Sequence, residues 1–243
     1  MASRDLNWRG IWNARDLGGL ATVDGGLTRP GAIVRADSLQ NLESQGWEEV
    51  EAYGIRTVVD LRNDNEIGPD VAPRPESIET VRIPLDVTED REFWDVWGNG
   101  PEFATPLYYG PHLERFPERS AAVVRAIATA RPGGVAFHCH GGRDRSGQVA
   151  LLVLALAGVE AEAIAADYAL SEARLRPHYL SRGEEDEGPK VAEFLRARGT
   201  TASALILELL AAIDVEATLL RAGLAEEDVV ALRRRLAPTD HLG

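Results

Sequence analysis

The stretch "VAFHCHGGRDRSGQVALLVLALAG", Val135–Gly158, contains Cys139, the only cysteine of the chain. Its first part, VAFHC, is a short apolar run of the kind that forms a buried strand. Its second part, SGQVALLVLALAG, has the length and apolar content of a buried helix. The segment HGGRDR leaves room only for a tight connection between them. The stretch therefore predicts a strand, a glycine-containing loop and a helix, with the thiol where the loop begins.

Short β-type runs and helical patterns alternate around this stretch. The predicted strands are residues 31–37, 55–62, 78–85 and 135–139. The predicted helices are residues 42–53, 117–130, 146–157, 160–171, 202–211 and 226–236. Strands alternating with helices indicate an α/β fold with a mostly parallel central sheet flanked by helices, and a helical C-terminal part at about 146–243. In such sheets the strand-to-helix loops lie at the carboxyl edge, where ligands bind.

The length of 243 residues fits a single domain, residues 1–243. Within it, residues 86–115 form an insertion rich in aromatic side chains and interrupted by glycine and proline: Phe93, Trp94, Trp97, Phe103, Tyr108 and Tyr109. Two interpretations stay open at this point. The insertion is a lid or pocket wall against which a substrate packs, or it is a satellite core under a long excursion of the chain.

The formal net charge is −13, and residues 183–188 read GEEDEG. A surface of this sign repels nucleic acid and anionic membranes at long range. We therefore expect no nucleic-acid partner and no stable membrane association. The single cysteine cannot form an internal disulfide, and the N-terminal residues show no apolar core of signal-peptide length, so we expect a cytoplasmic location.

The predicted loop has the parts of an anion site that carries a nucleophile. Backbone N–H groups of a glycine-containing loop and the positive end of a helix dipole attract an anion and stabilise a thiolate. Arg145, six positions after Cys139, has a planar fork that can hold two phosphoryl oxygens. We expect Cys139 to be the nucleophile and Arg145 the clamp. The rest of the predicted phosphate cradle is His140, Gly141, Gly142, Arg143, Ser146 and Gly147.

These residues resemble a known family. The segment HCHGGRDRSG is similar to the H-C-x5-R-[ST]-G signature of cysteine-dependent protein tyrosine and dual-specificity phosphatases. NARDLGG (13–19), RADSL (35–39), VVDLRNDNE (58–66) and the C-terminal LLRAGLAEEDVVALRRRL resemble the bacterial branch, whose members also act on phosphoserine, phosphothreonine and phosphoinositides. The resemblance spans nearly the whole chain. It implies metal-independent hydrolysis of phosphomonoesters through a phosphocysteine, with no cofactor.

The chain departs from that branch at two loop positions. Arg143 stands where the branch usually has lysine, and His140 stands where it has a smaller residue. Both changes bear on the choice of substrate and leave the reaction in place. The motif NARDLGG places Arg15 and Asp16 either near the site or in a plain turn.

The proton donor for the leaving group has more than one candidate. Asp60 ends the strand at 55–62 and Asp144 lies on the loop itself, and we favour these two equally. Asp86 also follows a strand. For Asp60 and Asp144 the alternative is a structural partnership with Arg62 or Arg145. His138 is expected to orient the loop through a hydrogen bond and to transfer no proton.

Two other loop motifs do not fit these residues. A nucleotide-binding Walker motif would need lysine and serine or threonine where Gln148 and Val149 stand, and a rhodanese-type loop would need arginine in place of Asp144. No cluster with metal-ligand spacing is present, so no metal is expected. The substrate stays open between a phosphorylated protein and a small phosphorylated metabolite, nucleotide or phosphoinositide. A module that binds phosphorylated ligands without turnover is the alternative of another class.

Overall fold

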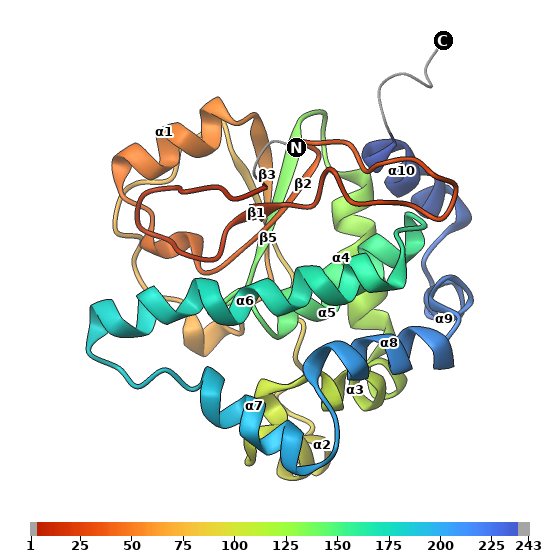
Figure 1. The fold of residues 1–243 in the computed structure, drawn as a ribbon. Coiled ribbons are helices and arrows are strands. Elements are labelled where there is room, and N and C mark those ends of the chain that lie inside the picture. Colours follow the sequence, from red (N-terminus) through yellow and green to blue (C-terminus); the bar gives the residue numbers. More distant parts are fainter. Residues whose placement is uncertain (1–3, 238–243) are drawn as a thin grey trace.

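The computed structural model describes residues 4–237, apart from the side chains of residues 181 and 182. Five strands form one sheet in the order β1-β2-β5-β3-β4. β1 runs antiparallel to β2, and the other neighbours are parallel (Figure 1). The strands are β1 Arg15–Asp16, β2 Ile33–Ala36, β3 Ile55–Asp60, β4 Glu79–Arg82 and β5 Gly134–His138. The predicted α/β fold with a mostly parallel sheet is confirmed.

Helices surround this sheet within the described part of the chain. The α-helices are α1 Ser44–Ala52, α2 Arg91–Trp97, α3 Tyr109–Arg115, α4 Pro117–Thr129, α5 Arg145–Leu156, α6 Ala161–Arg182, α7 Gly188–Ala197, α8 Ala202–Ala212, α9 Val215–Arg221 and α10 Glu226–Leu236. Short 3-10 helices lie at η1 Leu39–Asn41, η2 Asp64–Glu66, η3 Pro101–Ala104 and η4 Pro106–Tyr108.

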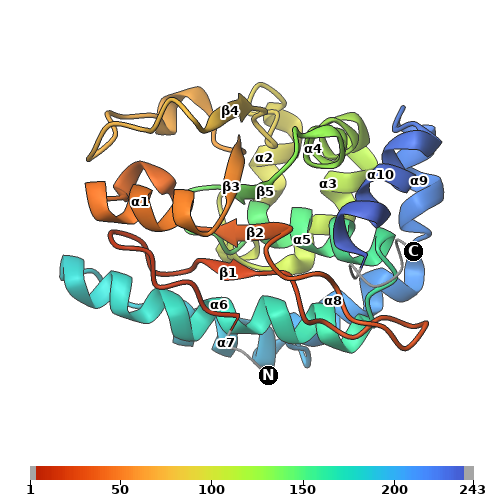
Figure 2. The same cartoon turned by 90° about the horizontal axis from the view of Figure 1, so that it is seen from above.

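The central strands are apolar on both faces because both faces are covered. Val34, Val58 and Ala136 share one cluster with Trp47 and Val50 of α1. The alternate residues of the same strands, among them Ile33, Val59 and Phe137, belong to a larger cluster with α4, α5 and the C-terminal helices. Figure 2 shows α1 on one side of the strands and α4 and α5 on the other.

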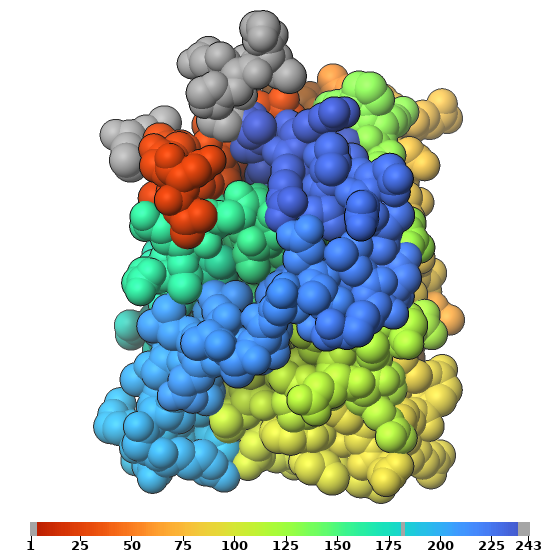
Figure 3. All heavy atoms as spheres, turned by 90° about the vertical axis from the view of Figure 1, so that its right-hand side faces the viewer, coloured from red at the N-terminus to blue at the C-terminus, as the bar shows by residue number. Residues whose placement is uncertain are grey.

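α5 lies inside the molecule, and almost all of its residues are buried. A helix that is apolar on every side, as this one is, has to be surrounded by other elements. The C-terminal helices supply part of that cover, and Figure 3 shows them spread over one side of the molecule. Among residues 4–237, no helix is long and apolar enough to cross a membrane.

The predicted elements appear with shifted ends. The four predicted strands correspond to β2, β3, β4 and β5, and the six predicted helices to α1, α4, α5, α6, α8 and α10. The helix predicted to end at residue 171 was too short, because α6 continues to Arg182 with Pro177 inside it. β1, α2, α3, α7 and α9 were not predicted. The predicted helical part reached residue 243, and its last six residues lie outside the described chain.

The insertion at 86–115 is built from α2, η3, η4 and α3. Its aromatic side chains are divided between the core and the cavities. Tyr108 and Tyr109 are buried in the larger core, and Phe93 is buried as well. Phe103 and Trp94 instead line cavities at the carboxyl edge of the sheet.

Candidate active site

A cavity of about 330 Å³ opens at the carboxyl edge of the parallel strands, where ligand sites of open α/β sheets lie. Its walls come from the loops after β3, β4 and β5, from η3 and from α6. The lining residues are Asn63, Asn65, Glu66, Asp86, Phe103, Cys139, His140, Gly141, Arg143, Asp144, Arg145, Leu175 and Tyr179. The fold therefore brings Cys139 and Arg145 together in one open site.

Cys139 directly follows β5 and is buried, with its sulfur facing the loop. The N–H of Gly142 donates to its Sγ at 3.2 Å. Gly142 has a φ of +69°, and a Cβ there would lie 2.6 Å from the backbone of Ala36 in β2. Glycine is required at this position, because only glycine combines that φ with so close an approach to a strand.

Arg145 is the first residue of α5, and two carboxylates hold its guanidinium. Glu66 accepts hydrogen bonds from both terminal nitrogens of Arg145, and the bond from Nη2 is 2.6 Å long. Oδ2 of Asp86 lies 3.5 Å from Nε of Arg145. Burial alone would lower the pKa of Arg145, but the hydrogen bond to Glu66 and the charge of Cys139 raise it above its ordinary value. The guanidinium is therefore charged and fixed in the cavity.

Asp86 is a buried carboxyl group whose pKa is raised to about 6, chiefly by burial, although Arg145 and Asn63 act to lower it. Its Oδ2 accepts from the amide of Asn63 at 3.4 Å, and its Oδ1 is buried without a hydrogen-bond donor in the described structure. Nε2 of His112 lies 3.9 Å from this oxygen. Burial lowers the pKa of His112 to about 4, so this imidazole is neutral near pH 7.

Asp60 lies at the expected edge but is fully engaged with Arg62. Its two carboxylate oxygens accept from Arg62 Nε at 2.9 Å and from Nη2 at 2.7 Å. Burial would raise the pKa of Asp60, but the hydrogen bond to Arg62 outweighs it, and the pKa is lowered. Asp60 is not among the residues that line the cavity. The arrangement matches the structural partnership with Arg62 that was the alternative for this residue.

His138 has the orienting contact expected from the sequence. Its Nδ1–H donates to the carbonyl of Cys139 at 3.1 Å, which assigns the proton to Nδ1. Burial lowers the pKa of His138 to about 4, although the charge of Asp60 acts in the opposite direction. The ring is therefore neutral near pH 7 and fixed against the first peptide of the loop.

Asp144 lies in the cavity and keeps part of its side chain exposed. Its carboxylate accepts from Arg143 Nε at 3.3 Å, so the two charged loop residues pair with each other. Arg143 also lines a second cavity between α6, α7 and α8. Of the two aspartates favoured from the sequence, the fold thus brings only Asp144 into the cavity with Cys139.

The remaining predicted cradle residues are divided. His140 and Gly141 line the cavity, whereas Gly142, Ser146 and Gly147 do not. α5 begins at Arg145, so Ser146 lies inside the helix and does not cap it, and its hydroxyl donates to Ala36 O at 3.5 Å. A Cβ on Gly147 would lie 2.6 Å from the hydroxyl oxygen of Tyr109, so close packing already explains this glycine.

Five cavity residues received no role from the sequence: Asn63, Asn65, Glu66, Leu175 and Tyr179. Glu66 ends the motif VVDLRNDNE, so its position in a motif was a usable signal. Leu175 and Tyr179 come from the part of α6 beyond the predicted helix end. Among residues 4–237, no group of three or more histidine, cysteine, aspartate or glutamate side chains is placed to hold a metal ion.

Comparison with known proteins places these features in a family. A model of the tyrosine phosphatase family matches residues 6–238. A triple specificity protein phosphatase from Mycobacterium tuberculosis is 30% identical over 235 residues, which cover 82% of each chain. A putative tyrosine-protein phosphatase from Cupriavidus necator is 34% identical over 179 residues, 70% of this chain and 64% of that protein.

A third relative, a tyrosine-protein phosphatase from Nostoc commune, is 31% identical over 157 residues, 64% of this chain and 51% of that protein. The last two matches thus span less than two thirds of the relatives' lengths, whereas the family model covers almost all of this chain. The chain belongs to the tyrosine phosphatase family and is a phosphoric monoester hydrolase.

Proposed function

We propose that this enzyme hydrolyses phosphomonoesters through a phosphocysteine on Cys139. The observation that supports this most directly is the meeting of the Cys139 sulfur, the loop and the Arg145 guanidinium in one open cavity. In the first step the thiolate attacks phosphorus, the S–P bond forms and the ester P–O bond breaks. Asp144 gives its proton to the leaving oxygen, because it is the one of the two aspartates favoured from the sequence that lines the cavity.

In the second step a water molecule attacks the phosphocysteine. Asp144, now a carboxylate, takes the proton of that water, and the sulfur leaves as a thiolate. The oxygens of the phosphoryl group are held by Arg145 and by loop N–H groups. Glu66 engages one N–H on each terminal nitrogen of Arg145 and Asp86 lies 3.5 Å from Nε, so the second N–H on each terminal nitrogen stays available to phosphate oxygens.

We infer that the substrate is a protein phosphorylated on tyrosine, with serine or threonine as further sites. Phe103, Leu175 and Tyr179 give the cavity a partly apolar rim, which suits an aromatic leaving group. The relatives, named as a triple specificity protein phosphatase, a putative tyrosine-protein phosphatase and a tyrosine-protein phosphatase, support the same class. We further propose that the chain acts as one catalytic domain.

The test is phosphate release, in EDTA, from phosphopeptides, nucleotides, sugar phosphates, inositol phosphates and an aryl phosphate. We expect the wild type to act best on phosphotyrosine peptides. Cys139→Ser is expected to lower kcat by at least about 10⁴-fold, as removal of a nucleophile does elsewhere. If a small phosphorylated metabolite is hydrolysed faster than the phosphopeptides, that metabolite class would replace phosphorylated proteins as the proposed substrate. Tight binding of a phosphorylated ligand without turnover would show a binding module.

A further inference from the structure

The loop from Cys139 to Asp144 is surrounded by donors to its carbonyl groups. All six carbonyl oxygens accept a hydrogen bond. The donors, in order along the loop, are His138 Nδ1 for Cys139, the Ser38 N–H for His140, Asn13 Nδ2 for Gly141, Arg35 Nη2 for both Gly142 and Arg143, and the Tyr109 hydroxyl for Asp144, whose carbonyl also accepts from the Gln148 N–H at 2.9 Å. No residue of the loop itself supplies one of these donors.

These contacts fix the direction of the N–H groups as well. A peptide unit is planar and trans, so its N–H points opposite to its carbonyl. The carbonyl of Gly141 is held by Asn13, and the N–H of the same peptide, on Gly142, points at the Cys139 sulfur. In this peptide the carbonyl held from outside thus turns the N–H towards the sulfur.

Arg35 is the charged member of this shell and holds two consecutive peptides. Its Nη2 donates to Gly142 O at 2.9 Å and to Arg143 O at 3.2 Å. These two carbonyls belong to the peptides that carry the N–H groups of Arg143 and Asp144. No acceptor among the described residues takes the N–H of either, although both residues line the cavity.

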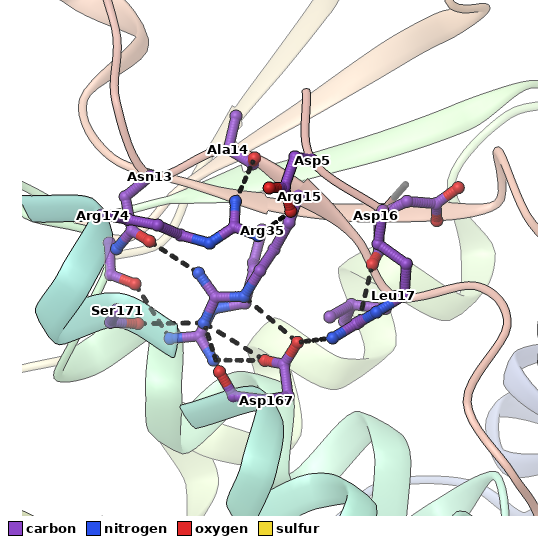
Figure 4. Close-up of polar contacts among 12 residues, drawn as sticks. Asp5, Asn13, Ala14, Arg15, Asp16, Leu17, Arg35, Asp167, Ser171 and Arg174 are labelled. Atoms are coloured by element: carbon purple, nitrogen blue, oxygen red, sulfur yellow. Dashed lines mark hydrogen bonds and ion pairs between the residues drawn. The ribbon is translucent and has the colours of Figure 1, made fainter. Parts of the chain in front are cut away.

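Asp167 of α6 fixes Arg35 from the other side. It accepts from Arg35 Nη1 at 2.9 Å, and the Arg35 side chain is 1% exposed. Arg15 binds the same carboxylate and also donates to Asn13, which holds Gly141 (Figure 4). Arg35 thus holds the loop directly and Arg15 holds it through Asn13, and both arginines meet at one buried carboxylate.

Tyr109 makes the corresponding contact at the end of the loop. Its hydroxyl donates to Asp144 O at 2.6 Å, and this peptide carries the N–H of Arg145. The neighbouring Tyr108 is buried to the same degree, but its hydroxyl has no hydrogen-bond partner in the described structure. The chain therefore contains its own matched pair of tyrosines, of which one holds the loop.

We propose that Arg35 and Tyr109 are positioning residues that hold the loop carbonyls outward, so that the loop N–H groups are preset to receive the oxygens of a phosphoryl group. The proposal rests on the proposed function, in which this loop is the phosphate cradle. Neither residue touches the substrate. Their effect appears in how tightly any tetrahedral oxyanion binds, and it is independent of the leaving group.

The test compares two variants with matched controls. Arg35→Gln is paired with Arg125→Gln. Like Arg35, Arg125 bridges a carboxylate, that of Asp228 at 3.0 Å, and a backbone carbonyl, but it lies in the interface of α4 and α10. Tyr109→Phe is paired with Tyr108→Phe. The readouts are the calorimetric Kd for tungstate, the number of binding sites, and kcat/KM for two aryl phosphates with different leaving groups.

We expect Arg35→Gln to raise the tungstate Kd and lower kcat/KM by about tenfold to hundredfold, equally for both substrates. Tyr109→Phe is expected to change both by about threefold to tenfold, the value of one hydrogen bond. Arg35→Lys, which keeps the charge but has a single donor centre, should lie between wild type and Arg35→Gln. Both control variants should retain the wild-type values.

A purely structural role would give a different pattern. Loss of folded protein lowers the number of tungstate sites and kcat but leaves the Kd and KM of the remaining sites unchanged, and that result would overturn the proposal. If Arg35→Gln does not fold, the tyrosine pair decides alone. The proposed function fails separately, if the wild type releases no phosphate or if Cys139→Ser retains activity. The positioning proposal fails if the wild type is active and both test variants bind tungstate as tightly as the wild type does.

Discussion

Three aspartates near the thiol differ in what their carboxylates contact. Asp60 is held by Arg62, Asp86 is buried beside Arg145, and Asp144 lines the cavity with part of its side chain exposed. We expect Asp144→Asn to slow aryl phosphates with poor leaving groups by about 10²-fold or more, because these need the proton, and those with good leaving groups far less. Asp60→Asn should slow both equally. Steady-state kinetics on both ester types checks this, and a leaving-group effect confined to Asp86→Asn would move the role to Asp86.

The raised pKa of Asp86 predicts a pH dependence of anion binding. This carboxyl group is neutral below about pH 6 and negative above it, and it lies 3.5 Å from Arg145. The negative form repels a dianion, so inhibition by sulfate, whose own charge stays constant, should weaken as pH rises through that value. Asp86→Asn should flatten this profile and bind sulfate more tightly at neutral pH. An unchanged profile in the variant would assign the dependence to another group.

At the residue scale, sequence spacing was enough to predict that Cys139 and Arg145 share a site, because both belong to one short loop and the helix after it. The partners of Arg145 could not be predicted in the same way. Glu66 and Asp86 reach it from loops after two other strands, and their approach depends on how those strands pair. The motif VVDLRNDNE includes Glu66 but does not show which residue Glu66 binds.

Among the elements, the loop after β5 depends on its close contact with β2. Gly142→Ala places a methyl group 2.6 Å from the Ala36 backbone at a φ of +69°, so the loop has to move. We expect a loss of kcat/KM of at least about 10²-fold, comparable to the loss of an oxyanion-hole donor, together with lower stability. Gly141→Ala is the comparison, since the nearest atom to its Cβ is Leu175 Cδ1 at 3.9 Å. Kinetics and urea unfolding of both variants measure the difference, and a larger loss in Gly141→Ala would contradict this account.

The length of α6 illustrates why element ends were harder to predict than element types. The prediction stopped at residue 171, where the pattern becomes more polar and Pro177 follows, since proline removes a backbone donor inside a helix. In the structure α6 continues through Pro177 to Arg182, and Leu175, in this continuation, is buried. Tertiary contacts therefore maintain a helix that local propensity would end, and they bring Leu175 and Tyr179 to the cavity.

Across the whole molecule, Asp167 joins segments that are far apart in the sequence. It pairs with Arg4 at 2.9 Å, Arg15 at 3.1 Å and Arg35 at 2.9 Å, and so ties α6 to the N-terminal segment, β1 and β2 (Figure 4). Alternating strands and helices could predict the sheet, but not this cluster, because Arg15 and Asp167 are 152 positions apart. The sequence left Arg15 of the motif NARDLGG either near the site or in a plain turn. In the structure Arg15 donates to Asn13, and Asn13 donates to the carbonyl of Gly141 in the loop.

The same cluster predicts how stability responds to acid. Burial would raise the pKa of Asp167, but the charges of Arg15, Arg35 and Arg4 outweigh it and hold the pKa well below its usual value. A carboxyl group whose folded pKa is depressed stabilises the fold fully above its unfolded pKa, about 3.9, and loses this contribution as pH falls towards the folded value. Asp167→Asn leaves three arginines without their common partner and should cost about 3–5 kcal/mol at pH 7. Urea unfolding of both proteins from neutral pH to pH 3 measures this difference. It should shrink as the pH falls through about 3.9, because Asp167 is then protonated in the unfolded wild type while it stays charged in the fold. A difference that stays constant would show that the charge of Asp167 is not what stabilises the cluster.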